Sequence, residues 1–182
     1  MSKGAAAEAL RRHIGVCYDI CHGAVEYEDP ATAFAAFRNA GIRVAKLQLS
    51  SALRLPSIDA ATERALSAFD DGVYLHQVVE RRDGTVTRFI DLAPAFDALR
   101  AGRAGGEWRV HCHVPIFLET AGAFQSTQPT LKSALACTRG AFVAPHLEVE
   151  TYTWSVLPAE LRRASLVDAI VREMQWVMAQ LK

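Results

Sequence analysis

Residues 13–19 (HIGVCYD) and 42–49 (IRVAKLQL) decide the fold, because they flank a helical segment at the start of the chain. The first is a short apolar run and the second alternates apolar with polar residues, so both are predicted strands. Between them, Asp29 and Pro30 are residue types that begin a helix, and Gly41 ends it. A strand–helix–strand order of this length predicts parallel pairing and indicates the α/β class.

The rest of the chain continues this alternation within one predicted domain, residues 1–182. Residues 73–92 are predicted to form an inserted β-hairpin, because Asp83 and Gly84 suit a tight turn between two strand-forming runs. The other predicted elements are parallel-type strands at 108–114 and 146–151, and helices at 58–69, 95–101, 128–139 and 165–181.

Composition excludes several classes of protein. The 182 residues are 51% hydrophobic, enough for a buried core, and contain 20 Lys and Arg against 20 Asp and Glu. A chain without net charge has no general attraction for nucleic acid or an anionic membrane surface. No stretch reaches the roughly 20 apolar residues of a membrane span, and the start lacks a secretory signal pattern. We therefore expect a cytoplasmic protein with no nucleic-acid partner and no membrane span.

The four cysteines are too few and too scattered for a disulfide scaffold. Cys17 and Cys21 lie four residues apart, directly before His22, but no second Cys/His pair has finger-like spacing. We expect reduced thiols and no zinc finger.

The predicted strands each have one apolar and one polar face. The polar sets are Lys46, Gln48 and Ser50; Arg109, His111 and His113; and His146, Glu148 and Glu150. A parallel sheet covered on both faces would contain continuous hydrophobic strands. The alternation therefore favours a closed or partly closed (β/α) barrel, with a polar site at the carboxyl ends of its strands.

Asp19, Gln48, His113 and Glu150 lie at such strand ends, and their convergence predicts a functional pocket. Two structural alternatives remain open. Buried histidines need only hydrogen-bond partners, and Lys46 would form a structural ion pair with a glutamate across the barrel.

Several segments resemble known proteins. Residues 15–22 (GVCYDICH) are similar to the fifth-strand motif of xylose-isomerase-like barrels, the superfamily of sugar isomerases, epimerases and endonuclease IV. The chain as a whole resembles EboE, a metabolite-traffic family of such TIM barrels. The segments that carry this second resemblance are 21–30 (CHGAVEYEDP), 46–54 (KLQLSSALR), 75–79 (LHQVV), 111–115 (HCHVP) and 148–158 (EVETYTWSVLP).

The resemblance implies a divalent metal, Zn, Mn or Mg, with ligands among Asp19, His22, His113 and Glu150. Lys46 and Gln48 stand where the superfamily often has a metal-binding histidine, and a glutamine oxygen is a weaker ligand than imidazole for zinc or manganese. The residues expected to contact a substrate are Gln48, Arg54, His111, Tyr152 and Trp154. Lys46 and Glu148 are the expected catalytic residues, moving a proton.

Length separates this chain from a complete barrel, which typically needs about 250 residues. The four predicted barrel strands resemble strands five to eight, so the expected fold is a partial (β/α)8 TIM barrel, the C-terminal half. The open edges predict self-association or pairing with a separate N-terminal half barrel. Two functions fit: a metal-dependent isomerase or epimerase acting on a small polar metabolite, and a non-catalytic metabolite carrier.

Overall fold

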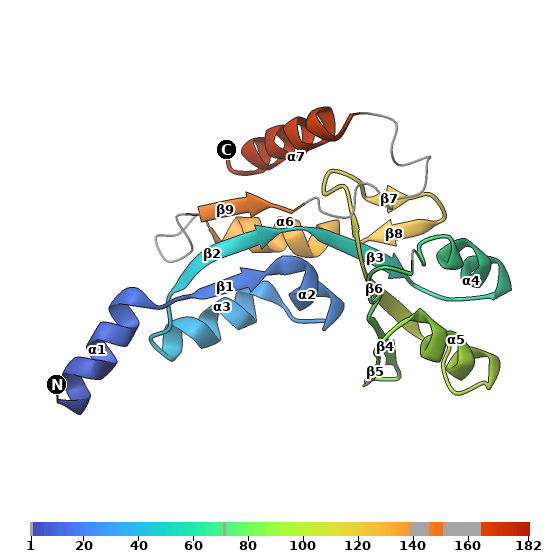
Figure 1. The fold of residues 1–182 in the computed structure, drawn as a ribbon, viewed down its shortest axis with the longest axis horizontal. Coiled ribbons are helices and arrows are strands. Elements are labelled where there is room, and N and C mark those ends of the chain that lie inside the picture. Colours follow the sequence, from blue (N-terminus) through green and yellow to red (C-terminus); the bar gives the residue numbers. More distant parts are fainter. Residues whose placement is uncertain (1, 71, 139–145, 151–164) are drawn as a thin grey trace.

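The computed structural model describes residues 2–70, 72–138, 146–150 and 165–182, which form a mixed α/β structure (Figure 1). The helices are α1 (Lys3–His13), α2 (Ile20–Val25), α3 (Pro30–Asn39), α4 (Ala60–Ser67), α5 (Leu92–Arg100), α6 (Gln128–Cys137) and α7 (Leu166–Gln180). The strands are β1 (Val16–Asp19), β2 (Val44–Leu49), β3 (Ser51–Leu55), β4 (Val78–Arg82), β5 (Thr85–Phe89), β6 (Glu107–Val114), β7 (Thr120–Ala121), β8 (Phe124–Ser126) and β9 (His146–Val149).

The strands are arranged in two sheets. A parallel three-stranded sheet has the order β1-β2-β9, and an antiparallel six-stranded sheet has the order β5-β4-β6-β3-β8-β7. Only Ser50 separates β2 from β3, so one nearly continuous ribbon crosses from the first sheet into the second (Figure 1). This crossing places the carboxyl ends of the parallel strands beside the antiparallel sheet.

The predicted strand–helix–strand unit at the start of the chain is confirmed. β1 and β2 pair in parallel, with Tyr18 opposite Leu47. The Asp29 side chain caps α3 by accepting a hydrogen bond from the Thr32 amide, and Gly41 follows the helix with φ +66°.

The predicted hairpin is also present, as β4 and β5. Asp83 and Gly84 both have positive φ, 51° and 79°, as a tight primed turn requires. β4 also pairs with β6, so the hairpin is built into the edge of the six-stranded sheet.

The prediction that residues 108–114 form a parallel strand is wrong. β6 pairs antiparallel with both β3 and β4, and β9 lies directly beside β2. Alternating polarity is equally typical of an antiparallel sheet with one face on the core, so the pattern did not fix the strand's direction. Residues 51–55, where the sequence analysis predicts no strand, form β3. No closed barrel is present in the described part of the chain.

The predicted faces of the strands are confirmed. Leu47 and Leu49 of β2 are buried in a core that α3, α6 and α7 complete with Phe34, Leu131 and Val177. A second core fills the space between the six-stranded sheet and helices α4 and α5. It contains Trp108, Val110, Cys112 and Val114 of β6. The other face of the six-stranded sheet meets α2, through polar side chains of β6 and through a small apolar cluster of Cys21, Val25, Ala52 and Val79.

Candidate functional site

Helix α2 contains the predicted ligand His22 and its neighbour Cys21, and follows β1 without a loop. Asp19 caps it, because its Oδ1 accepts a hydrogen bond from the His22 amide at 3.0 Å. At the other end, Arg109 Nη1 donates to the Ala24 carbonyl at 2.6 Å. The spacing of Asp19 and His22 therefore has a structural role: it fixes the start of a helix that rests on the polar face of β6.

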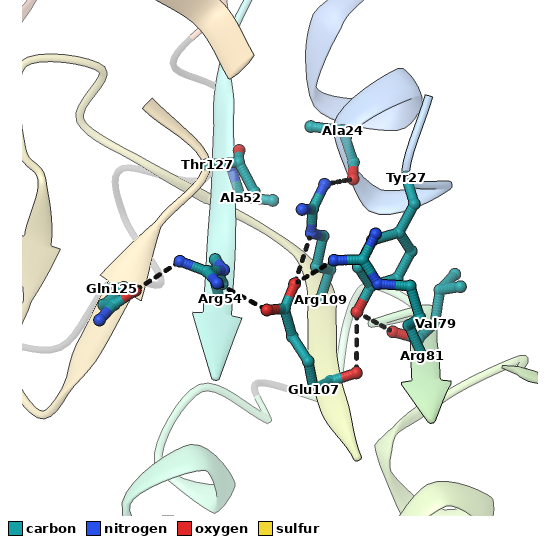
Figure 2. A network of polar contacts seen from close by, with 10 residues as sticks. All are labelled: Ala24, Tyr27, Ala52, Arg54, Val79, Arg81, Glu107, Arg109, Gln125 and Thr127. Carbon is teal, nitrogen blue, oxygen red and sulfur yellow. Dashed lines mark hydrogen bonds and ion pairs between the residues drawn. The ribbon is translucent and has the colours of Figure 1, made fainter. Parts of the chain in front are cut away.

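A partly buried polar network holds α2 against the six-stranded sheet (Figure 2). Glu107 lies at its centre and binds Arg54 Nη2 at 2.6 Å and Arg109 Nε at 3.2 Å. Tyr27, just beyond α2, donates its hydroxyl to the Glu107 carbonyl at 2.8 Å, and the Arg109 guanidinium lies 4.0 Å from its ring centre. The turn after α2 is thus clamped to β6 by charge-assisted bonds and a cation–π contact.

The arginines of this network stabilise the ionised form of Glu107. Burial alone raises the pKa of Glu107, but the hydrogen bonds and charges of Arg54 and Arg109 outweigh it and hold the pKa below its ordinary value. Burial raises the pKa of Tyr27 to about 12, and the Glu107 charge adds to this effect. Glu107 is therefore ionised and Tyr27 is a hydrogen-bond donor at neutral pH.

Three histidines and one cysteine meet where α2 contacts β6. His111 Nε2 and His113 Nε2 lie 3.1 Å apart, and the rings of His22 and His111 have centres 4.1 Å apart. One ligand atom each from Cys21, His111 and His113 lies within 4.8 Å of the other two. We call these three residues the Cys-His-His cluster. Cys21 is fully buried and His113 is 3% exposed.

The imidazoles of the cluster are neutral. Burial lowers the pKa of His111 to about 3, and His113 and His22 add to this effect while Asp19 opposes it. Burial lowers the pKa of His113 to about 4, opposed by a hydrogen bond to the backbone of Glu150. Burial raises the pKa of the Cys21 thiol well above its ordinary value, and the charges of Asp19 and Glu150 raise it further.

Two predicted carboxylates, Asp19 and Glu150, border the Cys-His-His cluster. Burial raises the pKa of Glu150, the Asp19 charge adds to this, and a hydrogen bond with Gln48 opposes it. Glu150 Oε2 is buried and makes no hydrogen bond to the described residues. Asp19 lies opposite Gln48 and Gln48 opposite Glu148 in the parallel sheet, so the three share one face.

The predicted catalytic pair, Lys46 and Glu148, lies on the same face of the parallel sheet, with Lys46 two residues before Gln48 in β2. Lys46 Nζ and Glu148 Oε2 form an ion pair of 2.7 Å, with side chains 31% and 58% exposed. The Glu148 interaction raises the pKa of Lys46, which therefore remains charged. An ion pair with a glutamate was the alternative role of Lys46, but this one joins the neighbouring strands β2 and β9 and does not cross a barrel.

The five expected substrate contacts fall into three groups. Arg54 lies in β3 and its guanidinium binds both Glu107 and Gln125, the latter at 2.7 Å (Figure 2). Tyr152 and Trp154 lie outside the described residues. His111 belongs to the Cys-His-His cluster, and Gln48 forms a hydrogen bond with Glu150 beside it.

The structure brings together a different set of possible metal ligands from the predicted one. Of the four expected ligands, Asp19, His22, His113 and Glu150, only His113 belongs to the Cys-His-His cluster. Cys21, which the sequence analysis does not name as a candidate ligand, belongs to it as well. The sequence signal for Cys21 is its position in the first helical turn directly after a strand. A side chain there lies near the elements that pack over the end of the strand.

Comparison with known proteins adds no relative to this description. No family model matches the chain, and no match was found among curated proteins or among solved structures. No helix in the described ranges is long and apolar enough to cross a membrane. Function is therefore inferred from the site at the junction of the two sheets.

Proposed function

We propose that this protein handles a small, polar, uncharged metabolite at the junction of its two sheets, in the manner implied by its resemblance to the EboE metabolite-traffic family. One observation carries the proposal. Imidazoles from α2 and β6 converge with two carboxylates at the carboxyl edge of a parallel sheet: Asp19, the last residue of β1, and Glu150, which follows β9. Such edges are where α/β proteins place ligand-binding groups.

The expected ligand is uncharged because the nearby cations are already engaged. Arg54 binds Glu107, and Lys46 binds Glu148. In contrast, Glu150 Oε2 is a buried acceptor without a described partner, which a ligand hydroxyl would satisfy. Polyols and neutral sugars present such hydroxyls.

A divalent metal at the Cys-His-His cluster would supply Lewis-acid polarisation of a hydroxyl or carbonyl. The chain's own groups would then orient the metabolite: Gln48 and Glu150 by hydrogen bonds, and His22 along the edge of the cluster. This arrangement supports isomerase or epimerase chemistry.

The ion pair of Lys46 with Glu148 favours the second candidate, a carrier that binds the metabolite without converting it. Both groups expected to move a proton are held by each other at 2.7 Å. Product analysis after incubation distinguishes the two, since an enzyme converts a bound polyol or sugar into an isomer and a carrier returns it unchanged.

The architecture supports a wider proposal about the fold. Three parallel strands with helices on one face are what a sector of a (β/α) barrel contains. β1 and β9 are the edges of this sheet among the described strands. A second copy or a separate half barrel would complete the wall there, as the sequence predicts.

Thermal denaturation with a panel of neutral polyols and sugars tests the proposed function, with sugar phosphates for comparison. A ligand at 100 times its Kd adds about 2.7 kcal/mol, which for a chain of this size raises Tm by roughly 5–10 °C. Glu150→Ala should abolish the response, while Glu119→Ala, which removes an exposed partner of Lys132, should retain it. If no neutral compound shifts Tm, or if Glu150→Ala responds like the parent protein, the proposal is wrong.

A further inference from the structure

The Cys-His-His cluster combines donor atoms from two separate parts of the fold. Cys21 lies in the first turn of α2, while His111 and His113 lie on one face of β6. The sequence separation is about ninety residues. Hydrogen bonds of Arg109 and Tyr27 hold α2 against the six-stranded sheet, as does an apolar cluster of Cys21, Val25, Ala52 and Val79. The donor atoms are therefore positioned by the tertiary structure.

We propose that Cys21, His111 and His113 bind one zinc ion and leave its fourth coordination position open. This inference deepens the proposed function and rests on it only for the role of the open position. The three ligands and the metal are argued from the cluster itself.

The distances suit a tetrahedral zinc ion. Zinc–nitrogen bonds of about 2.0–2.1 Å place two nitrogens about 3.3 Å apart, and a zinc–sulfur bond of about 2.3 Å places sulfur about 3.6 Å from nitrogen. The two histidine nitrogens lie 3.1 Å apart, and all three donor atoms lie within 4.8 Å of one another. Shifts of a few tenths of an ångström to about 1 Å would bring all three to bonding distance.

The donor chemistry favours zinc over the other metals expected from the sequence. Thiolate and imidazole suit zinc, whereas magnesium and manganese prefer oxygen ligands. His111 and His113 are neutral, as metal ligands must be. Zinc binding would release the Cys21 thiol proton to solvent, giving a thiolate ligand.

The surroundings balance the charge of such a site. Zinc with one thiolate has a net charge of +1, and the carboxylates of Asp19 and Glu150 lie close enough to act on the Cys21 thiol. His113 also interacts with the backbone of Glu150, the kind of outer contact that orients a metal-binding imidazole. Three protein ligands with one open position are typical of catalytic rather than structural zinc.

Cobalt substitution of the whole chain tests the ligand set without any mutation. We expect the protein to bind one Co²⁺ with the intense visible bands of tetrahedral cobalt and a thiolate-to-cobalt charge-transfer band in the near ultraviolet. Zinc should remove these bands in a one-to-one titration. Cobalt that binds without the thiolate band, or no binding at all, would overturn the proposal.

Single substitutions test which cysteine binds the metal. Cys21→Ser should lose the charge-transfer band and weaken zinc binding at least tenfold, with circular dichroism checking that the fold remains. Cys137→Ser, in α6 and outside the cluster, is the matched control and should bind as the parent does. Equal zinc content in the Cys21→Ser and parent proteins, measured by elemental analysis, would contradict the assignment.

The same samples separate this inference from the proposed function. Zinc binding with no Tm response to any polyol or sugar supports the metal site and refutes the metabolite proposal. A metabolite response that is equal in zinc-free and zinc-loaded protein assigns no role to the open position and refutes that part of the inference.

Discussion

Glu107→Gln tests the polar network that holds α2 in place. The change keeps the shape of the side chain but removes the charge that Arg54, Arg109 and the more exposed Arg81 share. Arg54 is 34% exposed and regains water, whereas Arg109 is 14% exposed and is left with an uncompensated charge. Breaking a buried pair costs about 3–5 kcal/mol, and the partial exposure of Arg54 places the expected loss near the lower end, about 3 kcal/mol.

The assay is urea unfolding at neutral pH, followed by circular dichroism. A loss of about 3 kcal/mol should also lower Tm by roughly 6–12 °C in a chain of this size. Glu119→Gln is the control, because Glu119 forms an exposed ion pair with Lys132 and should cost less than about 1 kcal/mol. A loss below about 1 kcal/mol for Glu107→Gln would refute the reasoning.

The pH dependence gives a second check on the same residue. The pKa of Glu107 is held below its ordinary value in the folded protein, so its contribution is fully present above the pKa of the unfolded chain. That contribution is lost as the pH falls through the lower, folded pKa. The stability difference between the parent and Glu107→Gln should therefore shrink below about pH 4.5. A difference that stays constant down to pH 3 would show that the charge of Glu107 does not act through this network.

Two further predictions concern the histidines of the Cys-His-His cluster and the packing of helix α2. Because the pKa of His111 is about 3 and that of His113 about 4, against about 6.5 when unfolded, the metal-free protein should lose about 2–3 kcal/mol per histidine between pH 6.5 and 4.5. Urea unfolding at both pH values measures this, and His113→Gln should remove about half of the histidine contribution; an undiminished loss would count against it. Gly23→Ala should cost about 1–3 kcal/mol, because the added Cβ would overlap the Tyr18 hydroxyl. Gly4→Ala, with open space around it in α1, should cost nothing in the same thermal melts, and equal melts for both variants would disprove the close approach.

The sequence determined the local structure well, because capping and turn signals act over a few residues. Asp29 before Pro30 predicted the start of α3, and Asp83 with Gly84 predicted the turn of the β4–β5 hairpin. Alternation also assigned the buried and polar faces of β2 and β6 correctly, since side chains on a strand must point to opposite sides.

Only the tertiary structure decided the direction of β6 and the partners of Cys21. A two-residue period is the same in parallel and antiparallel strands, so polarity patterns carry no information on direction. The contact of Cys21 with His111 and His113 depends on how α2 packs against a strand about ninety residues away. That packing is set by Arg109, Tyr27 and the crossing from β2 into β3, and none of these long-range contacts leaves a periodic signal in the chain.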